Sequence, residues 1–432
     1  MVKILSLEID ILAEQIKSVR GTKDITPDEV YKWQYVESVA RSVFEIFGFR
    51  EIRTPIFEHT ELFVKGTGET TDIVQKEMYT FTDKGGRSLT LRPEGTPPVV
   101  RSYLENNLYT DMPICKLYYI APMFRYERPQ AGRFRQHQQI GAEMIGSSSP
   151  YADAEVISMY LHFISKLGIE DSQLHLNSVG CAVCKPGYND ALKAYASEHF
   201  DSLCDLCKDR FDRNPLRMLD CKIEQCRAIF ARGPVMIDHL CEDCKKHLDT
   251  VVQSLNKLRL PHDIDPFLVR GLDYYTKTVF EVTARGLGSQ DAIAGGGRYD
   301  NLVEQFGGKP TPALGFGSGQ NRIIATMEAQ NIKFPDPPSI QIYIACLSER
   351  AASEAFEISY LLRQKGIPTE MSLEGRSLRS QMKTADKLGV RYAIIIGDDE
   401  INQGAVILRN MADGQQESVD IQRIVASVED KI

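Results

Sequence analysis

The chain has 432 residues, a length typical of about two to three domains. Hydrophobic residues make up 43% and charged residues 25%, which is ordinary for a globular protein and excludes a disordered or collagen-like chain. Lys and Arg total 51 against 59 Asp and Glu, and the net charge of −8 argues against non-specific nucleic-acid binding over the whole surface, although a local basic patch can still bind one.

The sequence shows no sign of a membrane or secretory segment. No apolar run reaches the roughly 20 residues that a membrane-spanning helix needs. Near the N-terminus, Glu8 and Asp10 interrupt the chain before an apolar core forms, which is not the pattern of a secretory signal. We therefore expect a cytoplasmic protein without a membrane partner.

The first predicted element is a helix that starts within residues 26–29, Thr-Pro-Asp-Glu. The threonine is expected to cap it, the proline to take the first helical position, and the glutamate to close a capping box. Apolar residues then recur at helical spacing up to Gly48, which is typical of a helix end. Residues 49–55 follow as a strand whose proline suits a sheet edge or a break.

Two strands are predicted at 116–127 and 135–143, on either side of a turn that contains proline and glycine. Because side chains alternate along a strand, Gln139 and Glu143 share one face of the second strand. Polar side chains that project from the same face of a sheet indicate the floor of a binding site rather than a core.

The rest of the chain predicts a domain within a domain, followed by a separate unit. Residues 172–260 are rich in cysteine and charge, and read as a helical insertion into a sheet domain formed by 1–171 and 261–330. The proline-rich stretch 331–339 is typical of a linker. Strand and helix patterns alternate over 340–432, which indicates an α/β unit.

Eight of the ten cysteines form the pairs Cys181/Cys184, Cys204/Cys207, Cys221/Cys226 and Cys241/Cys244. Disulfides are rare in a reducing cytoplasm, so paired cysteines there more often indicate a metal. The first two pairs have the spacing of a four-thiolate site, which makes Cys181, Cys184, Cys204 and Cys207 candidate ligands of a structural zinc. The alternative is that the thiols are buried apolar groups, and no open His or carboxylate ligand set indicates a catalytic zinc.

A phosphate-binding loop of the G-x-x-x-x-G-K-[ST] type is missing, since Pro310 follows Gly308-Lys309. If the protein uses ATP, scattered arginines are the obvious means of holding the phosphates, because an Arg fork matches phosphate oxygens and stays charged when partly buried. The candidates are Arg125, Arg133, Arg270 and Arg322. The non-functional alternative is that an arginine beside a glycine is a solvated turn residue.

Five stretches of this sequence together resemble the class II aminoacyl-tRNA synthetases, and among them the bacterial histidyl-tRNA synthetases. Residues 48–55, 124–133 (FRYERPQAGR) and 315–322 resemble the class motifs 1, 2 and 3. Residues 268–275 (LVRGLDYY) and 294–300 (AGGGRYD) resemble the two histidine-specific motifs. Motifs 1 and 3 are loose patterns, whereas motif 2 and the first histidine-specific stretch are far more specific.

The resemblance runs from Arg20 to the C-terminus and implies a fold and an activity. The implied fold is α+β, with an antiparallel-sheet catalytic domain of the class II type, a helical insertion and a C-terminal α/β anticodon-binding domain. The implied activity is ATP-dependent activation of L-histidine and its transfer to tRNA(His) by a homodimer, with Mg2+ accompanying ATP. DNA is not an expected partner.

The resemblance also implies which residues bind the substrates. Those expected to bind histidine are Glu94, Gly95, Thr96, Arg125, Gln139, Glu143, Arg270, Tyr274 and Tyr275, with Glu94 and Thr96 at the amino group. Those expected to bind ATP are Arg125, Glu127, Arg133, His137 and Arg322. We expect Arg125, Arg270 and Arg322 to act in catalysis, since fixed cations stabilise the charge that develops when a carboxylate attacks a phosphate.

Three positions depart from the family pattern. Asn321 stands where an acid usually precedes the motif 3 arginine, and Asn301 stands where glycine is usual. His137 replaces the phenylalanine on which adenine stacks, and an imidazole offers less stacking area. None of these changes removes a charge that the reaction clearly needs.

Contacts with tRNA are expected in two places. Gln130, in the motif 2 loop, would meet the acceptor end. Arg376, Arg379, Lys383 and Lys387 are predicted to share one face of a helix in the C-terminal unit. A solvated face is the default interpretation of such a basic stripe, but RNA contact is favoured here because the implied domain reads an anticodon.

Two other functions remain open at this point. The first is a non-catalytic, synthetase-like regulatory subunit of ATP phosphoribosyltransferase, against which the intact Arg125, Arg270 and Arg322 and the complete C-terminal unit argue. The second is another class II synthetase, for instance threonyl or prolyl, against which the stretch 270–275 argues.

Overall fold

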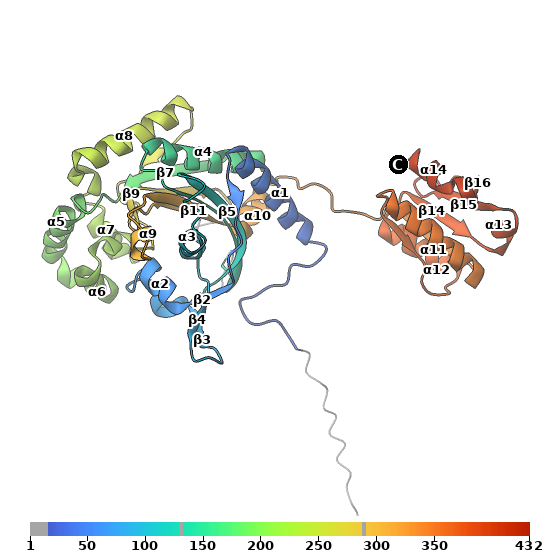
Figure 1. Ribbon diagram of the computed structural model, residues 1–432, viewed down its shortest axis with the longest axis horizontal. Coiled ribbons are helices and arrows are strands. Elements are labelled where there is room, and N and C mark those ends of the chain that lie inside the picture. The colour runs from blue at the N-terminus through green and yellow to red at the C-terminus, as the bar shows by residue number, and fades with distance from the viewer. Residues whose placement is uncertain (1–15, 129–132, 287–290) are drawn as a thin grey trace, which may run out of the picture. The chain divides into compact units, whose positions relative to one another are not determined.

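The computed structural model describes residues 16–128, 133–286 and 291–432. The chain divides into two compact units, one ending at Pro335 and the other beginning at Asp336 (Figure 1). The division lies inside the stretch 331–339 that was predicted as a linker. Among the described residues, no helix is both long enough and apolar enough to cross a membrane.

The larger unit is built on one large sheet. Its described strands are β1 (Arg50–Glu51), β5 (Cys115–Phe124), β6 (Gln136–Ile145), β7 (Ser172–Ser178), β8 (Asp263–Ile264), β9 (Thr276–Ala284), β10 (Ala292–Arg298) and β11 (Ala313–Gly319). They lie in the order β1-β5-β6-β11-β10-β9-β7-β8. The outer pairs β1–β5 and β7–β8 are parallel, and the other pairs of described strands are antiparallel. The predicted α+β class is therefore confirmed.

Alternation along the strands gives this sheet an apolar face and a polar face. Ile140 and Ala142 of β6 point into a core formed with helices on one side, whereas Gln139 and Glu143 belong to the opposite face. The helices of the apolar face are α1 (Val30–Ile46), α4 (Pro150–Lys166), α8 (Glu242–Lys257) and α10 (Gln320–Ala329), and Figure 1 shows α4 and α8 along this side of the sheet. The face that carries Gln139 and Glu143 is not part of this core.

Shorter elements surround the polar face. They are α2 (Thr60–Thr67), α3 (Thr96–Glu105), α9 (Leu302–Gln305), the π-helical turn Ile73–Glu77 and a small antiparallel sheet of β2 (Phe57–His59), β4 (Ser88–Leu91) and β3 (Tyr79–Thr82). Val99 and Tyr103 of α3 pack with Leu117 and Tyr119 of β5 in a second core. This second core fixes α3 against the polar face.

The start of α1 differs from the prediction. The helix begins at Val30, one turn after the predicted proline. The predicted capping box does not form, because the carboxylate of Glu29 accepts hydrogen bonds from the ammonium of Lys23 at 2.8 and 3.0 Å instead. Residues 26–29 form a turn that leads into the helix, with the amide of Val30 donating to the carbonyl of Thr26 at 2.9 Å.

The cysteine-rich insertion is helical, but it starts later than residue 172. Residues Ser172–Ser178 form β7, a strand of the large sheet, because Leu174 and Leu176 are buried in the main core. At its other end, Val251 of α8 belongs to the same core. The elements between are α5 (Cys184–Glu198), α6 (Asp205–Arg213), α7 (Glu224–Phe230) and the 3-10 turns Phe200–Ser202, Pro215–Asp220 and Met236–His239.

The C-terminal unit has a five-stranded sheet in the order β13-β12-β14-β15-β16. Its elements are β12 (Ile342–Cys346), α11 (Glu349–Gln364), β13 (Thr369–Met371), α12 (Leu378–Leu388), β14 (Tyr392–Ile396), α13 (Asp398–Asn402), β15 (Ala405–Asn410), β16 (Gln416–Asp420), the 3-10 turn Ile421–Arg423 and α14 (Ile424–Glu429). Ile342 and Ile344 pack against α11, whereas Tyr343 and Ala345 pack with Ala385 of α12. The two helices therefore cover opposite faces of the sheet.

Candidate active site

A cavity of about 330 Å³ lies over the polar face of the large sheet. The predicted site residues that line it are Glu94, Thr96, Arg125, Glu127, Arg133, His137, Gln139, Arg270, Tyr274, Tyr275 and Arg322. They come from segments far apart in the sequence, and the fold brings most of both predicted sets, for histidine and for ATP, into one hollow.

Glycines in β10 and β11 leave room for the side chains that cross this face. A Cβ at Gly295 would lie 1.8 Å from Nη2 of Arg270, and one at Gly317 would lie 1.9 Å from Nε2 of Gln139. Both distances are far below a van der Waals contact of about 3.5 Å. The glycine-rich stretches therefore allow polar side chains to lie flat on the strands.

Glu94 lines the cavity and is almost completely buried. Its Oε2 accepts a hydrogen bond from the hydroxyl of Tyr274 at 3.0 Å, and Oε1 accepts one from Thr67. Burial raises the pKa of this carboxyl above its ordinary value, against the opposing effects of Thr67, the charge of Arg125 and Tyr274. A cationic ligand would favour its ionised form.

Glu143 lies behind the cavity rather than on its lining. Its Oε1 accepts from Thr96 at 2.7 Å and its Oε2 accepts from Tyr299 at 2.6 Å. Gly315 on β11 makes room for it, since a Cβ there would lie 1.8 Å from Oε2. Burial raises the pKa of Glu143 to about 8, so this carboxyl is mainly protonated at neutral pH in the absence of a ligand.

Gln139 carries a polar atom without a partner. Its Oε1 is buried and accepts no hydrogen bond within the parts of the chain that the structure describes. Because a buried polar group without a partner is costly, an acceptor in this position on the cavity floor favours a donor from a ligand.

Arg270 forms an ion pair with Glu281 across the strand β10. The register places Glu281 of β9 opposite Gly295, and Nη1 of Arg270 donates to Oε2 of Glu281. The guanidinium therefore lies over Gly295 and is held at the cavity by Glu281.

Three more arginines line the cavity. Nε of Arg125 donates to the carbonyl of Pro93 at 2.8 Å, and Nη1 of Arg322 donates to a main-chain carbonyl of β10. Nη1 of Arg133 lies 3.3 Å from Oε2 of Glu127. The cavity lining thus carries several cationic groups, which suits an anionic ligand.

His137 lies among these cations and lines the cavity. Burial, together with the charges of Arg125 and Arg322, lowers its pKa to about 3. The imidazole is therefore neutral and available as an aromatic surface. Asn321 lines the same cavity, and its Oδ1 accepts a hydrogen bond from the amide of Gln138 at 3.1 Å.

None of the predicted tRNA-binding residues that the structure describes lines this cavity. Gln130 falls outside the described residues. Arg379, Lys383 and Lys387 are exposed on α12 of the C-terminal unit. Arg376 is also exposed, but it precedes α12 instead of lying within it, since the helix begins at Leu378.

Sequence reasoning missed several polar residues that shape the site. No role was predicted for Thr67, Tyr119, Glu281 or Tyr299. Tyr299 lies in the histidine-specific stretch 294–300, and the pairing of β9 with β10 would have placed Glu281 beside Gly295. Gly95 does not line the cavity; a Cβ there would lie 2.2 Å from Cζ of Tyr119, so its function is to let α3 approach that ring.

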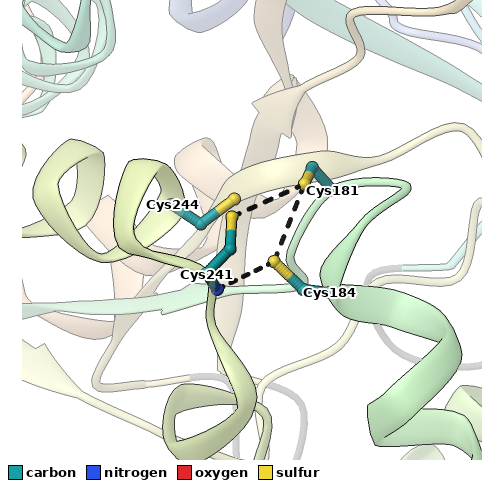
Figure 2. Close-up of side chains that lie close together, drawn as sticks. All are labelled: Cys181, Cys184, Cys241 and Cys244. Carbon is teal, nitrogen blue, oxygen red and sulfur yellow. Dashed lines mark hydrogen bonds between the residues drawn. The ribbon is translucent and has the colours of Figure 1, made fainter.

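The eight paired cysteines gather in two groups of four. Figure 2 shows the first, Cys181, Cys184, Cys241 and Cys244. The second consists of Cys204, Cys207, Cys221 and Cys226. The predicted set of Cys181, Cys184, Cys204 and Cys207 is therefore wrong as one site, because the fold brings each of these pairs to a later pair and not to each other.

Comparisons with known proteins match both units. The family model "Histidyl-tRNA synthetase" matches residues 21–323, and the family model "Anticodon binding domain" matches residues 341–431. The chain is 49% identical to the histidine–tRNA ligase of Halothermothrix orenii, over 96% of this chain and 99% of that protein. It is 51% identical to the histidine–tRNA ligase of Pelotomaculum thermopropionicum, over 96% and 97%.

A solved structure gives the same picture. The apo histidyl-tRNA synthetase of S. aureus superposes with a TM-score of 0.82 at 35% identity, covering 96% of this chain and 99% of that chain. The family model over most of the chain and the full-length relatives agree with the resemblance seen in the motifs. The chain belongs to the histidyl-tRNA synthetase family.

Proposed function

We propose that the chain is a histidine–tRNA ligase whose reaction takes place in the cavity over the polar face of the sheet. In the first step a carboxylate oxygen of L-histidine attacks the α-phosphorus of ATP. A bond forms between that oxygen and phosphorus, the bond to the bridging oxygen breaks, and pyrophosphate leaves with the electron pair. In the second step a terminal ribose hydroxyl oxygen of tRNA(His) bonds to the carbonyl carbon of the histidyl group. The bond from that carbon to the phosphate oxygen breaks, AMP leaves with the electron pair, and the hydroxyl proton passes to the phosphate or to solvent.

Arg270, Arg125 and Arg322 are the proposed catalytic residues. The first step brings two anions together, so it needs fixed cations that bind more strongly as charge develops on the α-phosphate. Histidine needs no general base, because its carboxyl group is already ionised at neutral pH. The Glu281 partner keeps Arg270 in place before the substrates arrive.

Histidine binding is assigned to the part of the cavity that Glu94 lines. The buried carboxylate of Glu94, with the hydroxyl of Thr96, is the proposed partner of the substrate ammonium group. Gln139 and Tyr275 face the imidazole, and Oε1 of Gln139 offers the acceptor that lacks a partner among the described residues. Glu143 supports this end from behind through Thr96.

ATP binding is assigned to the arginine-rich part of the cavity. Glu127, Arg133 and the neutral ring of His137 lie with Arg125 and Arg322 along this part of the lining. Mg2+ enters with ATP as part of the substrate. We also propose that the insertion holds zinc in a structural role, since its thiols gather in groups of four.

The C-terminal unit is proposed to bind tRNA(His), whose acceptor end would meet Gln130 in the motif 2 loop. The unit matches the anticodon-binding model, and its α12 presents the exposed side chains of Arg379, Lys383 and Lys387, with Arg376 just before it. We propose a cytoplasmic homodimer with neither DNA nor a membrane as partner.

The observation that carries this proposal is the meeting of a buried acid, Glu94, with several arginines in one cavity. The regulatory-subunit alternative is not favoured, because these cationic side chains are all present and the chain matches histidine–tRNA ligases over nearly their whole length. The test is ATP–pyrophosphate exchange with each of the twenty amino acids in turn. Exchange with histidine alone is expected, whereas exchange with another amino acid or with none would contradict the proposal.

A further inference from the structure

The eight insertion thiols have the geometry of two metal sites. Sγ of Cys181 lies 3.6 Å from Sγ of Cys184 and 3.9 Å from Sγ of Cys241 (Figure 2). In each group all four sulfurs lie within 4.8 Å of one another. Four sulfurs around a tetrahedral zinc, with Zn–S bonds of about 2.3 Å, are roughly 3.8 Å apart, whereas a disulfide needs about 2.05 Å.

The second group has the same features. Sγ of Cys204 lies 3.8 Å from Sγ of Cys221. Main-chain amides point at sulfurs in both groups: the amide of Cys204 donates to Sγ of Cys226 at 3.3 Å, and the amide of Cys241 donates to Sγ of Cys184 at 3.1 Å. Such hydrogen bonds stabilise thiolates and orient them toward a metal.

The insertion has few other means of holding itself together. Five of the twelve buried residues of its core are cysteines, and they lie among side chains such as Tyr188, Leu192, Met218 and Phe230. A core of this size rarely supplies enough hydrophobic stabilisation, and small domains compensate with metals or disulfides. The cysteines of the insertion are free thiols, so disulfides do not supply this stabilisation.

The stretch of chain that carries each group also carries a residue that contacts the segment 270–275. Lys185 follows Cys184 directly, and its Nζ donates to the main-chain carbonyl of Tyr275 at 2.7 Å. Asn214 lies between the two pairs of the second group, and its Nδ2 donates to Oδ1 of Asp273 at 2.8 Å. The insertion thus reaches the segment that carries Arg270, once through each group.

We propose that the insertion binds two structural zinc ions, one per group of four thiolates, and that these ions position the segment 270–275 through Lys185 and Asn214. Each ion takes four sulfur ligands, and the protons of the thiols go to solvent. The positioning half rests on the proposed function of Arg270 and Tyr275, whereas the metal half does not depend on it.

The metal half is tested by measuring the zinc content of the full chain purified without chelator. Double substitutions then show which cysteines bind the same ion. The parent should hold two zinc ions per chain. Cys181→Ser with Cys241→Ser should lose one, because both lie in one group, and Cys181→Ser with Cys204→Ser should lose both. Cys115→Ser, outside both groups, is the control and should lose none. A parent without zinc would overturn the metal half, and loss of only one ion in the Cys181/Cys204 double variant would overturn the ligand sets.

The positioning half is tested with Lys185→Ala and Asn214→Ala, which leave the thiols intact. Loss of one hydrogen bond to the segment should raise the KM for histidine in pyrophosphate exchange by about tenfold at unchanged zinc content and unchanged KM for ATP. Lys245→Ala is the matched control, since Lys245 follows Cys244 as Lys185 follows Cys184 but is exposed. It should match the parent.

A second readout separates a failure of positioning from a failure of the proposed function. Amide hydrogen exchange of 270–275 should be faster in both variants than in the parent, whether or not the chain catalyses pyrophosphate exchange. Unchanged amide exchange would overturn the positioning half. Absent pyrophosphate exchange in the parent would instead count against the proposed function alone.

Discussion

Removal or displacement of the Arg270 guanidinium should abolish most of the adenylation rate while leaving the fold intact. Arg270→Ala removes a cation aimed at the developing charge, and such a loss costs about 10²–10³-fold in kcat, or roughly 3–4 kcal/mol. Glu281 loses its partner in this variant, but its side chain is 26% exposed and can be hydrated. We therefore expect only a small change in thermal unfolding.

Gly295→Ala should give a similar loss without touching the charge. The new Cβ would lie 1.8 Å from Nη2 of Arg270, so the guanidinium must move by roughly 1.5–2 Å to reach an ordinary contact. The displaced atoms are the end of a flexible side chain, so the sheet can keep its structure. A displacement of about 1 Å already costs about 10²-fold in rate when the group is part of the reacting geometry.

The two substitutions should not multiply, because both remove the same interaction. Histidine-dependent pyrophosphate exchange of the double variant should lie within about threefold of Arg270→Ala, where independent effects would give at least about 10⁴-fold in total. Gly187→Ala in α5 is the control, since nothing lies within 4 Å of its Cβ, and it should be as active as the parent. Near-parent exchange in Arg270→Ala, or multiplied losses in the double variant, would refute the reasoning.

Three further predictions concern other parts of the molecule. Burial raises the pKa of Glu143 to about 8, so between about pH 5 and pH 8 the unfolded chain has lost this proton while the folded chain still keeps it. In denaturant titrations over this range, the unfolding free energy of the parent should therefore fall relative to that of Glu143→Gln, by up to about 1.4 kcal/mol per pH unit. Parallel pH dependences of the two proteins would contradict this prediction. His137→Phe should keep its activity and lower the KM for ATP about threefold, because a neutral imidazole is replaced by a larger ring; loss of exchange would show that a ring nitrogen is needed. Replacing Arg376, Arg379, Lys383 and Lys387 by Gln should weaken tRNA binding and reduce its salt slope by about one unit per lost phosphate contact. Pyrophosphate exchange should stay unchanged in that quadruple variant, and an unaltered salt slope would leave the stripe as a solvated face.

Short-range patterns in the sequence predicted local structure well where burial of apolar side chains or alternation along a strand determines it. The strand and helix patterns predicted to alternate over 340–432 do alternate in the structure, and the apolar run Tyr392–Ile396 forms the buried strand β14. The predicted face of 135–143 is also correct: Gln139 and Glu143 both lie on the polar face of β6. The start of α1 was missed because Lys23, outside the pattern, competes for the carboxylate of Glu29.

The grouping of the cysteines and the position of Glu143 depend on long-range contacts, which local sequence patterns do not contain. Four C-x-x-C-like pairs can combine in several ways, and only the path of α5 through α8 determines that Cys181 and Cys184 meet Cys241 and Cys244. That Glu143 lies behind the cavity depends on Gly315, which lies opposite it on the neighbouring strand β11 but 172 positions later in the chain, a pairing that no local pattern contains.

The most direct test of the site is a crystal structure of the full chain with a non-hydrolysable histidyl-adenylate analogue. The analogue should lie in the cavity over the polar face, with its amino group at Glu94 and Thr96 and the oxygens at its α-phosphate position within hydrogen-bond distance of Arg270. An analogue bound elsewhere, or bound in the cavity with Arg270 still turned only to Glu281, would contradict the assignment of the reaction to these residues.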